Sequence, residues 1–438
     1  MTEPVIRTPM NARLPADLTR DSAVEIAPGV HWVGVFDPDL RAFDLILHTA
    51  NGTTYNAYVV RGEAGVAVID TVKEEFSELF FRKFESVARY DEITHIVVNH
   101  LEPDHSGALP ELLRRAPQAK VCISSKAPLM LKALLKPIDA PVGGFRIVTS
   151  GDSADLGGRT LSFLHTPYLH WPDTQCTYLE DEGILFSGDI FGCHFCDTRL
   201  FNDRTGDFRF SFDYYYAHIM RAFRSHVVRA LDQIEPLALR MIAPAHGPIL
   251  RHSPHDYVRR YREFATPRLT NEAGGEKTLL VFYVSAYGNT RRMAEAVRDG
   301  AEEVDGVRVS LYDIEGSETN QFVDLVEEAD GLALGSPTIN GDAVRPIWDL
   351  LSSFTSISVQ GKLGAAFGSY GWSGEAVRMI EDRLRGIKFD VPVDGLRVKL
   401  VPTDDELGRC HEFGRQLATR LVTPPDIIDS TTPRPPTA

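Results

Sequence analysis

The sequence predicts a two-domain α/β protein, and three observations support this fold class. The chain has 438 residues, which is enough for two domains of ordinary size. Up to about residue 265, short apolar runs alternate with turn signals. From residue 277 on, apolar runs are separated by helical patterns, which is typical of βαβ units and a parallel sheet.

The first part contains five expected buried strands, at residues 66–70, 95–100, 121–124, 184–189 and 239–246. Several of them end in a polar residue, namely Asp70, His100, Asp189 and His246. Strand ends are where α/β folds display chemistry, because the sheet fixes the backbone while the loops vary. We therefore expect these side chains to include functional ones.

The second part contains five expected strands, at residues 278–285, 307–314, 331–336, 362–369 and 396–401, with a helical stretch at 290–303. Five such units in about 150 residues fit one doubly wound domain. We expect a first domain over residues 1–265, a Pro- and Gly-marked linker over 266–276 and a second domain over 277–422. The Pro- and Thr-rich residues 423–438 are expected to be a disordered tail.

Composition excludes several classes of function. The net charge of −15 argues against general affinity for nucleic acid, whose phosphates need Lys and Arg. No stretch of about 18 apolar residues would span a membrane, and the N-terminus lacks the apolar core of a secretory signal. The five cysteines include a single CxxC, Cys193 to Cys196, without the second pair of a zinc ribbon. We interpret them as packing residues in a reducing compartment, and expect a cytoplasmic protein.

Four potential metal ligands lie within six residues, at the end of the apolar run 96–98. They are His100, Glu102, Asp104 and His105. Many hydrolases of the metallo-β-lactamase superfamily carry a similar run with His in place of Glu102, and they bind zinc. A carboxylate at this position favours harder, redox-capable iron.

Three further residues are candidate metal ligands. Each is weak evidence by itself, but together with this run they strongly indicate a metal site. His170 precedes Trp171-Pro172-Asp173, Asp189 closes an apolar strand, and His246 lies in a Pro-Ala-His-Gly-Pro loop. Other histidines near these motifs, His95, His165 and His194, are interpreted as supporting or structural.

Three loops of the second part predict a flavin site. The residues after the first strand open a helix, where free N–H groups and the helix dipole favour a phosphate. Their spacing resembles the phosphate loop of flavodoxins, which indicates FMN. The loops after the third and fourth strands can supply backbone amides to the isoalloxazine, and Trp372 can stack on it. The candidate FMN-binding residues are Ser285, Tyr287, Gly288, Asn289, Thr290, Ser336, Pro337, Thr338, Ile339, Asn340, Gly341, Ser369, Tyr370, Gly371, Trp372, Ser373 and Gly374.

The order of these motifs resembles the flavodiiron family over nearly the whole chain. That resemblance implies a metallo-β-lactamase-like αββα sandwich followed by a flavodoxin-like, five-stranded, doubly wound parallel sheet. It implies two non-haem irons, the first held by His100, Glu102 and His170 and the second by Asp104, His105 and His246, with Asp189 bridging them. Direct ligation by His105 is the open point, because family members vary there. Glu102, Asp189 and His105 are the candidate catalytic residues.

The resemblance also implies an activity. The family passes electrons from an external donor through FMN to the diiron site, which reduces dioxygen to water, nitric oxide to nitrous oxide, or both. The family's donors are rubredoxin, a reductase or a reduced deazaflavin, and this chain contains no fused one. Family members form head-to-tail dimers, so a homodimer or homotetramer is expected. Tyr214, Tyr215, Tyr216 and His194 are candidates for the wall of the gas pocket.

Two alternatives stay open at this stage. One is a zinc-dependent hydrolase of the metallo-β-lactamase fold fused to a flavodoxin, which would leave the flavin without a role. The other is a non-catalytic redox or gas sensor, although no signalling segment is visible. The spacing of the motifs decides neither the preferred gas, nor the donor, nor dimer against tetramer.

Overall fold

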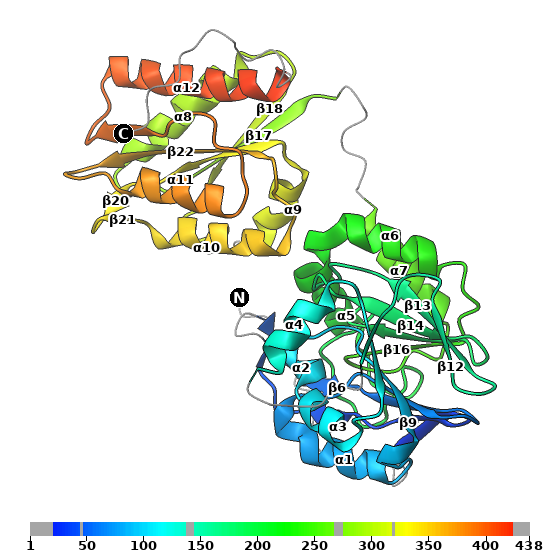
Figure 1. Cartoon of the computed structure of the whole chain (residues 1–438). Coiled ribbons are helices and arrows are strands. Elements are labelled where there is room, and N and C mark those ends of the chain that lie inside the picture. Colours follow the sequence, from blue (N-terminus) through cyan, green and yellow to red (C-terminus); the bar gives the residue numbers. More distant parts are fainter. Residues whose placement is uncertain (1–20, 44–46, 137–143, 267–274, 318–319, 424–438) are drawn as a thin grey trace. The chain divides into compact units, whose positions relative to one another are not determined.

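The computed structural model describes residues 21–43, 47–136, 144–266, 275–317 and 320–423 (Figure 1). The chain divides into two compact units, Met1–Thr266 and Pro267–Ala438. The predicted linker (266–276) and the predicted tail (423–438) lie mostly outside the described residues.

A mixed sheet of the first unit has the strand order β1-β2-β7-β8-β9-β10-β11. Neighbouring strands from β1 to β8 pair antiparallel, and those from β8 to β11 run parallel. The side chains of β8 are all buried Val, Ala and Ile, as expected for a strand covered on both faces. The strands are β1 (Val24–Ala27), β2 (Val30–Trp32), β7 (Tyr58–Arg61), β8 (Val66–Ile69), β9 (Ile93–Val97), β10 (Lys120–Ile123) and β11 (Phe145–Ile147).

A second sheet has the order β12-β13-β14-β15-β16 and is antiparallel except for the parallel pair β15 and β16. Its strands are β12 (Ser153–Asp155), β13 (Thr160–His165), β14 (Gln175–Leu179), β15 (Ile184–Gly188) and β16 (Met241–Pro244). Two short ribbons accompany the sheets, β3 (Val35–Asp37) with β6 (Thr53–Tyr55) and β4 (Ala42–Phe43) with β5 (Leu47–His48).

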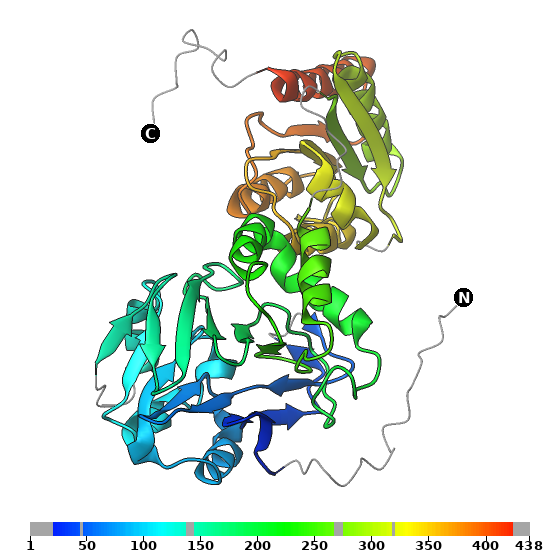
Figure 2. The same cartoon turned by 90° about the vertical axis from the view of Figure 1, so that its right-hand side faces the viewer.

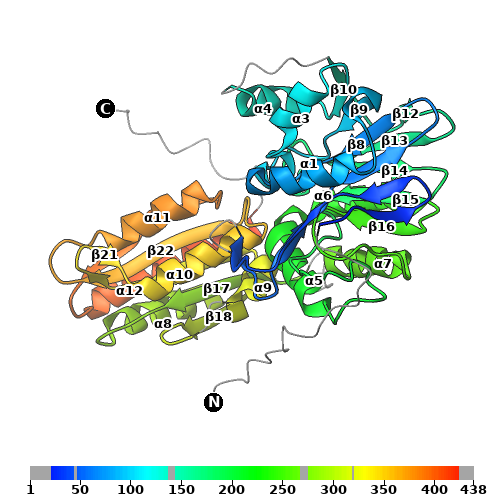
Figure 3. The same cartoon turned by 90° about the horizontal axis from the view of Figure 1, so that it is seen from below.

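The two sheets pack on each other and each carries helices on its outer face, so the unit is an αββα sandwich (Figures 2 and 3). On the first sheet lie α1 (Ser77–Glu85), α3 (Leu109–Arg115) and α4 (Ala127–Leu134), and on the second lie α5 (Arg209–Tyr215), α6 (Arg224–Ile234) and α7 (Pro254–Ala265). Short helical segments are η1 (Glu74–Phe76), η2 (Tyr90–Glu92), α2 (Pro103–Ser106), the π-helix η3 (Tyr216–Met220) and η4 (Arg221–Phe223).

A lysine side chain is enclosed in the first unit. Lys83 of α1 is 1% exposed, and its Nζ donates a hydrogen bond to the carbonyl oxygen of Gly34 at 2.7 Å. The same Nζ lies 4.1 Å from the centre of the Trp32 ring, a cation–π contact. Burial lowers the pKa of Lys83 to about 7, because the ammonium loses its hydration.

The second unit is built on five parallel strands in the order β18-β17-β19-β22-β23. They are β17 (Lys277–Tyr283), β18 (Val307–Asp313), β19 (Gly331–Gly335), β22 (Leu363–Tyr370) and β23 (Leu396–Lys399). A small hairpin, β20 (Thr338–Ile339) and β21 (Asp342–Ala343), extends the sheet beside the end of β22. The doubly wound parallel sheet expected from the sequence is confirmed.

Helices cover both faces of this sheet (Figure 1). One face carries α8 (Asn289–Glu302) and α12 (Asp404–Val422), and the other carries α9 (Asn320–Glu328), α10 (Arg345–Ser353), η5 (Phe354–Ser356) and α11 (Ala376–Gly386). The α8 and α12 helices pack closely through glycines. A Cβ at Gly414 would lie 1.8 Å from the Val297 carbonyl oxygen, and one at Gly300 equally close to the His411 carbonyl oxygen.

Four of the five cysteines lie where the packing interpretation expects them, whereas Cys196 is only partly buried. Cys122, Cys176, Cys193 and Cys410 are buried in the hydrophobic cores, and no disulfide joins cysteines of the described residues. In the part of the chain that the structure describes, no helix combines the length and the apolar composition needed to cross a bilayer.

Candidate metal centre and flavin site

The seven predicted metal ligands come together at the carboxyl ends of three strands. His100 follows β9, Asp189 follows β15 directly, and His246 lies two residues beyond β16. Glu102 precedes α2, whose single turn carries Asp104 and His105, and His170 lies in the connection between β13 and β14. The strands end before these residues, so the sequence-predicted strands at 95–100 and 239–246 are too long by two or three residues at this end.

The ligand atoms form two groups. In one, His170 Nε2 lies 2.9 Å from Glu102 Oε2, and His100 Nε2 lies 3.4 Å from the same oxygen. In the other, Asp104 Oδ2 lies 3.3 Å from His105 Nε2 and 3.1 Å from His246 Nε2. Each group can therefore offer nitrogen and carboxylate donors to one metal ion. The sets whose ligand atoms lie close enough to share one ion are Asp104, His105 and His246; Glu102, His170 and Asp189; and His100, His105 and Asp189.

Asp189 joins the two groups. Its Oδ2 lies 3.1 Å from His100 Nε2 and 3.4 Å from His170 Nε2. Its Oδ1 lies 3.3 Å from His105 Nε2 and 3.7 Å from His246 Nε2. One oxygen thus faces each group, which is the arrangement that a carboxylate bridging two metals requires.

Electrostatics show that this cluster requires positive charge. Burial favours the neutral acid, but the imidazoles, His100 first, outweigh it and lower the pKa of Asp189 well below its usual value. Burial likewise opposes the charged imidazole, yet Asp189 and Glu102 raise the pKa of His170 to about 10. Without metal, the raised pKa values of His100, His170 and His246 favour protonated imidazoles beside the buried carboxylates.

Buried polar atoms without hydrogen-bond partners show whether metal ions fit this cluster. Both carboxylate oxygens of Asp104 and Asp189, and both ring nitrogens of His100, are buried with no hydrogen-bond partner in the described part of the chain. Buried polar atoms almost always have a hydrogen-bond partner. Several buried ligand atoms that converge on one place without such partners are explained if they bind a pair of metal ions. Oxygen and imidazole donors of this kind suit iron.

The backbone beside His100 is held by residues that the sequence analysis did not include in the site. Asp70 accepts hydrogen bonds from the Asn99 backbone N–H at 2.7 Å and from its Nδ2 at 2.8 Å. Asp173 accepts from the backbone N–H of Leu101 at 2.9 Å. The sequence contains a feature that could have identified each carboxylate, because Asp70 ends a predicted strand and Asp173 closes the Trp-Pro-Asp motif.

The residues expected around the pocket separate into two sets. His194 and Tyr215 lie beside the centre, with ring centroids 4.9 and 6.2 Å from that of His246. Tyr214 instead stacks on His218, and Tyr216 packs on Tyr261 in the helical layer. His95 and His165 are strand residues of β9 and β13.

The three predicted flavin loops follow β17, β19 and β22, which are neighbours in the sheet, so they lie at one edge. Thr338 pairs with Tyr370 across β20 and β22, which places the second and third loops side by side. Thr290 and Ser369 join the first and third loops through a hydrogen bond of 2.9 Å between their hydroxyl oxygens. The structure thus brings the three loops together.

The exposed side chains of these loops fit a flat aromatic ligand. Tyr287 is 92% exposed and Trp372 is 78% exposed. Gly288, in the left-handed region with φ 79°, leads into α8 and has open space where a Cβ would stand, so the helix N-terminus is accessible to a phosphate. Ser336, by contrast, is fully buried, and its hydroxyl is used within its own loop, donating to Pro337 and accepting from the Val344 N–H.

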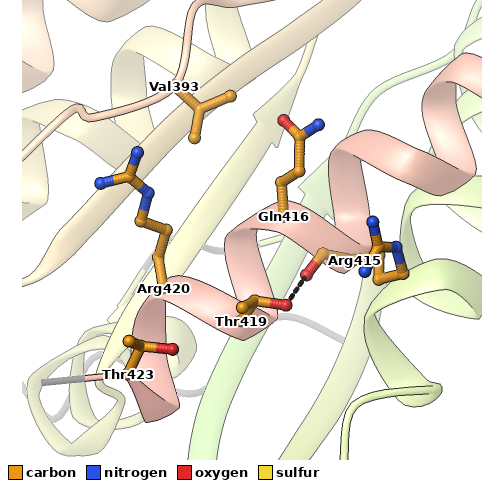
Figure 4. A pocket seen from close by; sticks show the side chains of 6 residues that line it. All are labelled: Val393, Arg415, Gln416, Thr419, Arg420 and Thr423. Atoms are coloured by element: carbon orange, nitrogen blue, oxygen red, sulfur yellow. Dashed lines mark hydrogen bonds between the residues drawn. The ribbon is translucent and has the colours of Figure 1, made fainter. Parts of the chain in front are cut away.

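Figure 4 shows a separate cavity of about 260 Å³ beside α12. Its residues are Val393, Arg415, Gln416, Thr419, Arg420 and Thr423. Thr419 donates its hydroxyl hydrogen to the carbonyl of Arg415, whose guanidinium is already bound by Glu412. This cavity gathers no set of converging polar groups, and we assign it no chemistry.

Comparison with known proteins identifies both units. Residues 53–247 match the model of the ODP family of β-lactamases, and residues 281–414 match that of flavodoxins. The chain is 62% identical to the type A flavoprotein FprA of Rhodobacter capsulatus over 91% of this chain and 92% of that protein. It is 35% identical to the nitric oxide reductase of Moorella thermoacetica over 91% of this chain and 99% of that one.

Two solved structures have the same architecture. The flavodiiron protein of Giardia intestinalis is 30% identical, with a TM-score of 0.62, and the match covers 92% of this chain and 97% of that one. The rubredoxin:oxygen oxidoreductase of Desulfovibrio gigas is also 30% identical, with a TM-score of 0.63 over 91% of this chain and 98% of that one. The chain belongs to the flavodiiron protein family. It is accordingly a flavodiiron oxidoreductase, with FMN and a pair of non-haem irons as its cofactors.

Proposed function

We propose that this flavodiiron protein reduces dioxygen to water, nitric oxide to nitrous oxide, or both, with electrons that enter through FMN. The observation that carries the proposal is Asp189, which presents one carboxylate oxygen to each of two buried ligand groups. The relative from Moorella is named a nitric oxide reductase and the Desulfovibrio structure an oxygen oxidoreductase, which supports both gases as substrates.

The proposed ligand set follows the two groups. His100, Glu102 and His170 hold the first iron, Asp104, His105 and His246 hold the second, and Asp189 bridges them. His105 is included because its Nε2 lies 3.2 Å from that of His246 and faces the same two carboxylates. Glu102, Asp189 and His105 are the proposed catalytic residues.

When bound, two ferrous ions and a reduced flavin supply four electrons, which dioxygen needs to become two waters, whereas the coupling of two nitric oxide molecules to nitrous oxide needs two. Aromatic side chains of the chain surround His246. Rings of Phe43, Tyr55 and Tyr215 lie 5.6 to 6.2 Å from that of His246. His170 has the most exposed side chain of the four ligand imidazoles, at 19%, so we infer that a small molecule enters on its side.

The proposed partners follow from the family. An external donor, which is a rubredoxin, a reductase or a reduced deazaflavin, delivers electrons to the FMN. We propose a head-to-tail homodimer, or a tetramer made from such dimers, in the cytoplasm. Full gas reduction by a variant that stays monomeric in sedimentation experiments would contradict the proposed assembly.

The test measures oxygen and nitric oxide consumption in parallel, with a chemically reduced small donor. Glu102→Ala is expected to abolish consumption of both gases. The matched surface variant Glu111→Ala is expected to keep it, because the ion pairs of Glu111 within the described part of the chain are with Arg114 and Arg115 on its own helix. Full activity of Glu102→Ala would refute the metal assignment.

The hydrolase and sensor alternatives are separated by two further measurements. A zinc hydrolase would be purified with zinc and without iron absorption in the visible spectrum. A sensor would contain iron and flavin but would not consume gas in the steady state. The three carboxylates converging with the histidines favour iron over zinc.

A further inference from the structure

A short segment of the chain, residues 54–56, forms hydrogen bonds with the loop that carries His246. The backbone N–H of Asn56 donates to the Ala245 carbonyl oxygen at 2.8 Å. Its side-chain Nδ2 donates to the carbonyl oxygens of Pro244 at 2.9 Å and Gly247 at 3.0 Å. Asn56 thus fixes the backbone on both sides of His246.

Thr54, two residues earlier, fixes the imidazole itself. Its carbonyl oxygen accepts a hydrogen bond from His246 Nδ1 at 2.7 Å, which leaves Nε2 as the ligand atom. Its Oγ1 accepts from the backbone N–H of Gly247 at 2.8 Å. The Thr53 hydroxyl also lies 3.3 Å from His246 Nδ1, and the Thr54 carbonyl makes the shorter contact. Thr54 and Asn56 therefore help to aim His246 Nε2 toward Asp104 Oδ2.

The segment is anchored in turn. Asn56 Oδ1 accepts a hydrogen bond from Trp32 Nε1 at 2.8 Å, and the Trp32 ring lies beneath the Lys83 ammonium. Thr54, Asn56 and Trp32 are all at most 1% exposed. A buried, fully bonded support of this kind holds a ligand in its binding geometry before the metal arrives.

We propose that Thr54 and Asn56 are positioning residues that set the metal affinity of the Asp104, His105 and His246 position and leave the other metal position unaffected. The inference rests on the ligand set of the proposed function. Their hydrogen bonds reach His246 and its neighbours, and among the described residues no hydrogen bond joins Thr54 or Asn56 to the side chains of His100, Glu102 or His170. Loss of such supports weakens metal binding by roughly 10- to 100-fold.

The experiment titrates the metal-free, full-length protein with Co²⁺ alone, by calorimetry and by absorption. His246→Ala and His170→Ala identify which binding step belongs to which position. Thr54→Val removes the Oγ1 acceptor of the Gly247 N–H and keeps the side-chain shape and the backbone carbonyl that accepts from His246 Nδ1, so it tests the hold on the His246 loop. Asn56→Ala removes the Nδ2 hydrogen bonds to Pro244 and Gly247. Thr177→Val is the matched control, because it removes an equally buried threonine hydroxyl that donates to Asn99 instead.

The expected result is that Thr54→Val and Asn56→Ala weaken the step missing in His246→Ala by roughly 10- to 100-fold and leave the other step unchanged. Thr177→Val should leave the His246 step at its wild-type affinity. Wild-type affinity of both steps in Thr54→Val, or an equal loss of the His246 step in Thr177→Val, would overturn the inference. Should Asn56→Ala not fold, Thr54→Val decides alone.

Failure of the proposed ligand set has a different signature. A wild-type protein that binds fewer than two Co²⁺ ions would refute the two-metal assignment, whereas two normal steps in every support variant refute only the role of Thr54 and Asn56. Thermal unfolding of each metal-free variant confirms that the chain is folded before titration.

Discussion

Lys83 makes the stability of the first unit depend on pH in a way that can be calculated. The pKa of this lysine is about 7 in the folded chain, against 10.5 for an exposed lysine. Between these values the unfolded chain binds a proton that the folded chain has released. Stability therefore rises with pH across this window, by about 2.5 kcal/mol between about pH 6 and pH 9.

The perturbation is Lys83→Met, which keeps an unbranched side chain of similar length but cannot be protonated. At pH 6 the wild type buries an ammonium that contacts the Gly34 carbonyl and the Trp32 and Phe36 rings, with no carboxylate ion pair among the described residues, so the variant should be at least as stable. At pH 9 the neutral amine keeps its hydrogen bond at no such cost. The free energy of unfolding of the wild type should then rise relative to the variant by about 2.5 kcal/mol.

The assay is urea unfolding of both proteins across this range, followed by tryptophan fluorescence because Trp32 lies against Lys83. Subtracting the two curves removes every other titrating group. Lys132→Met, at an exposed lysine of α4, is the control and should follow the wild type at every pH. A difference between wild type and Lys83→Met that stays constant from pH 6 to pH 9 would refute the reasoning.

Three further outcomes are expected. Gly414→Ala should lower the free energy of unfolding of the second unit by about 1 to 3 kcal/mol, because its Cβ would collide with the Val297 carbonyl. The control Gly408→Ala, on the same helix, has open space for its Cβ and should be neutral or slightly stabilising. Trp372→Ala should weaken flavin binding by about tenfold, measured as flavin fluorescence on release, and an unchanged affinity would remove Trp372 from the site. Removal of iron by a chelator should lower the melting temperature of the first unit, because a metal that binds only the folded chain stabilises it and the buried ligand atoms of Asp104 and Asp189 then lose their partners. Ferrous iron should restore the melting temperature, and a melting temperature insensitive to iron would contradict the fit of metal to this cluster.

Much of the candidate site was predictable because its chemistry is local in sequence. The dense run from His100 to His105, and Asp189 at the end of an apolar strand, carry their own signal. The alternation of strands and helices likewise predicted the doubly wound sheet. The sequence does not predict the exact ends of the strands, because the apolar pattern continues through Val98 although β9 ends at Val97.

The supports of the site were not predictable in the same way. Asn56 is an ordinary polar residue near a strand in sequence, and its importance arises only when folding brings the loop at 244–247 against it. Adjacency in sequence suggests that Tyr214, Tyr215 and Tyr216 all line the gas pocket. Helical geometry instead turns successive side chains by about 100°, so neighbouring residues point in different directions. Only Tyr215 of the three has its ring near that of His246.

The candidate metal ligands and the flavin loops do not interleave along the chain. All proposed ligands lie between His100 and His246, and all flavin loops lie after Val284, in the other compact unit. The two prosthetic groups can therefore be inserted independently and in either order during maturation. A cell short of iron should then accumulate a yellow, flavin-loaded protein without its metals, which purification from iron-limited cells and metal analysis would detect.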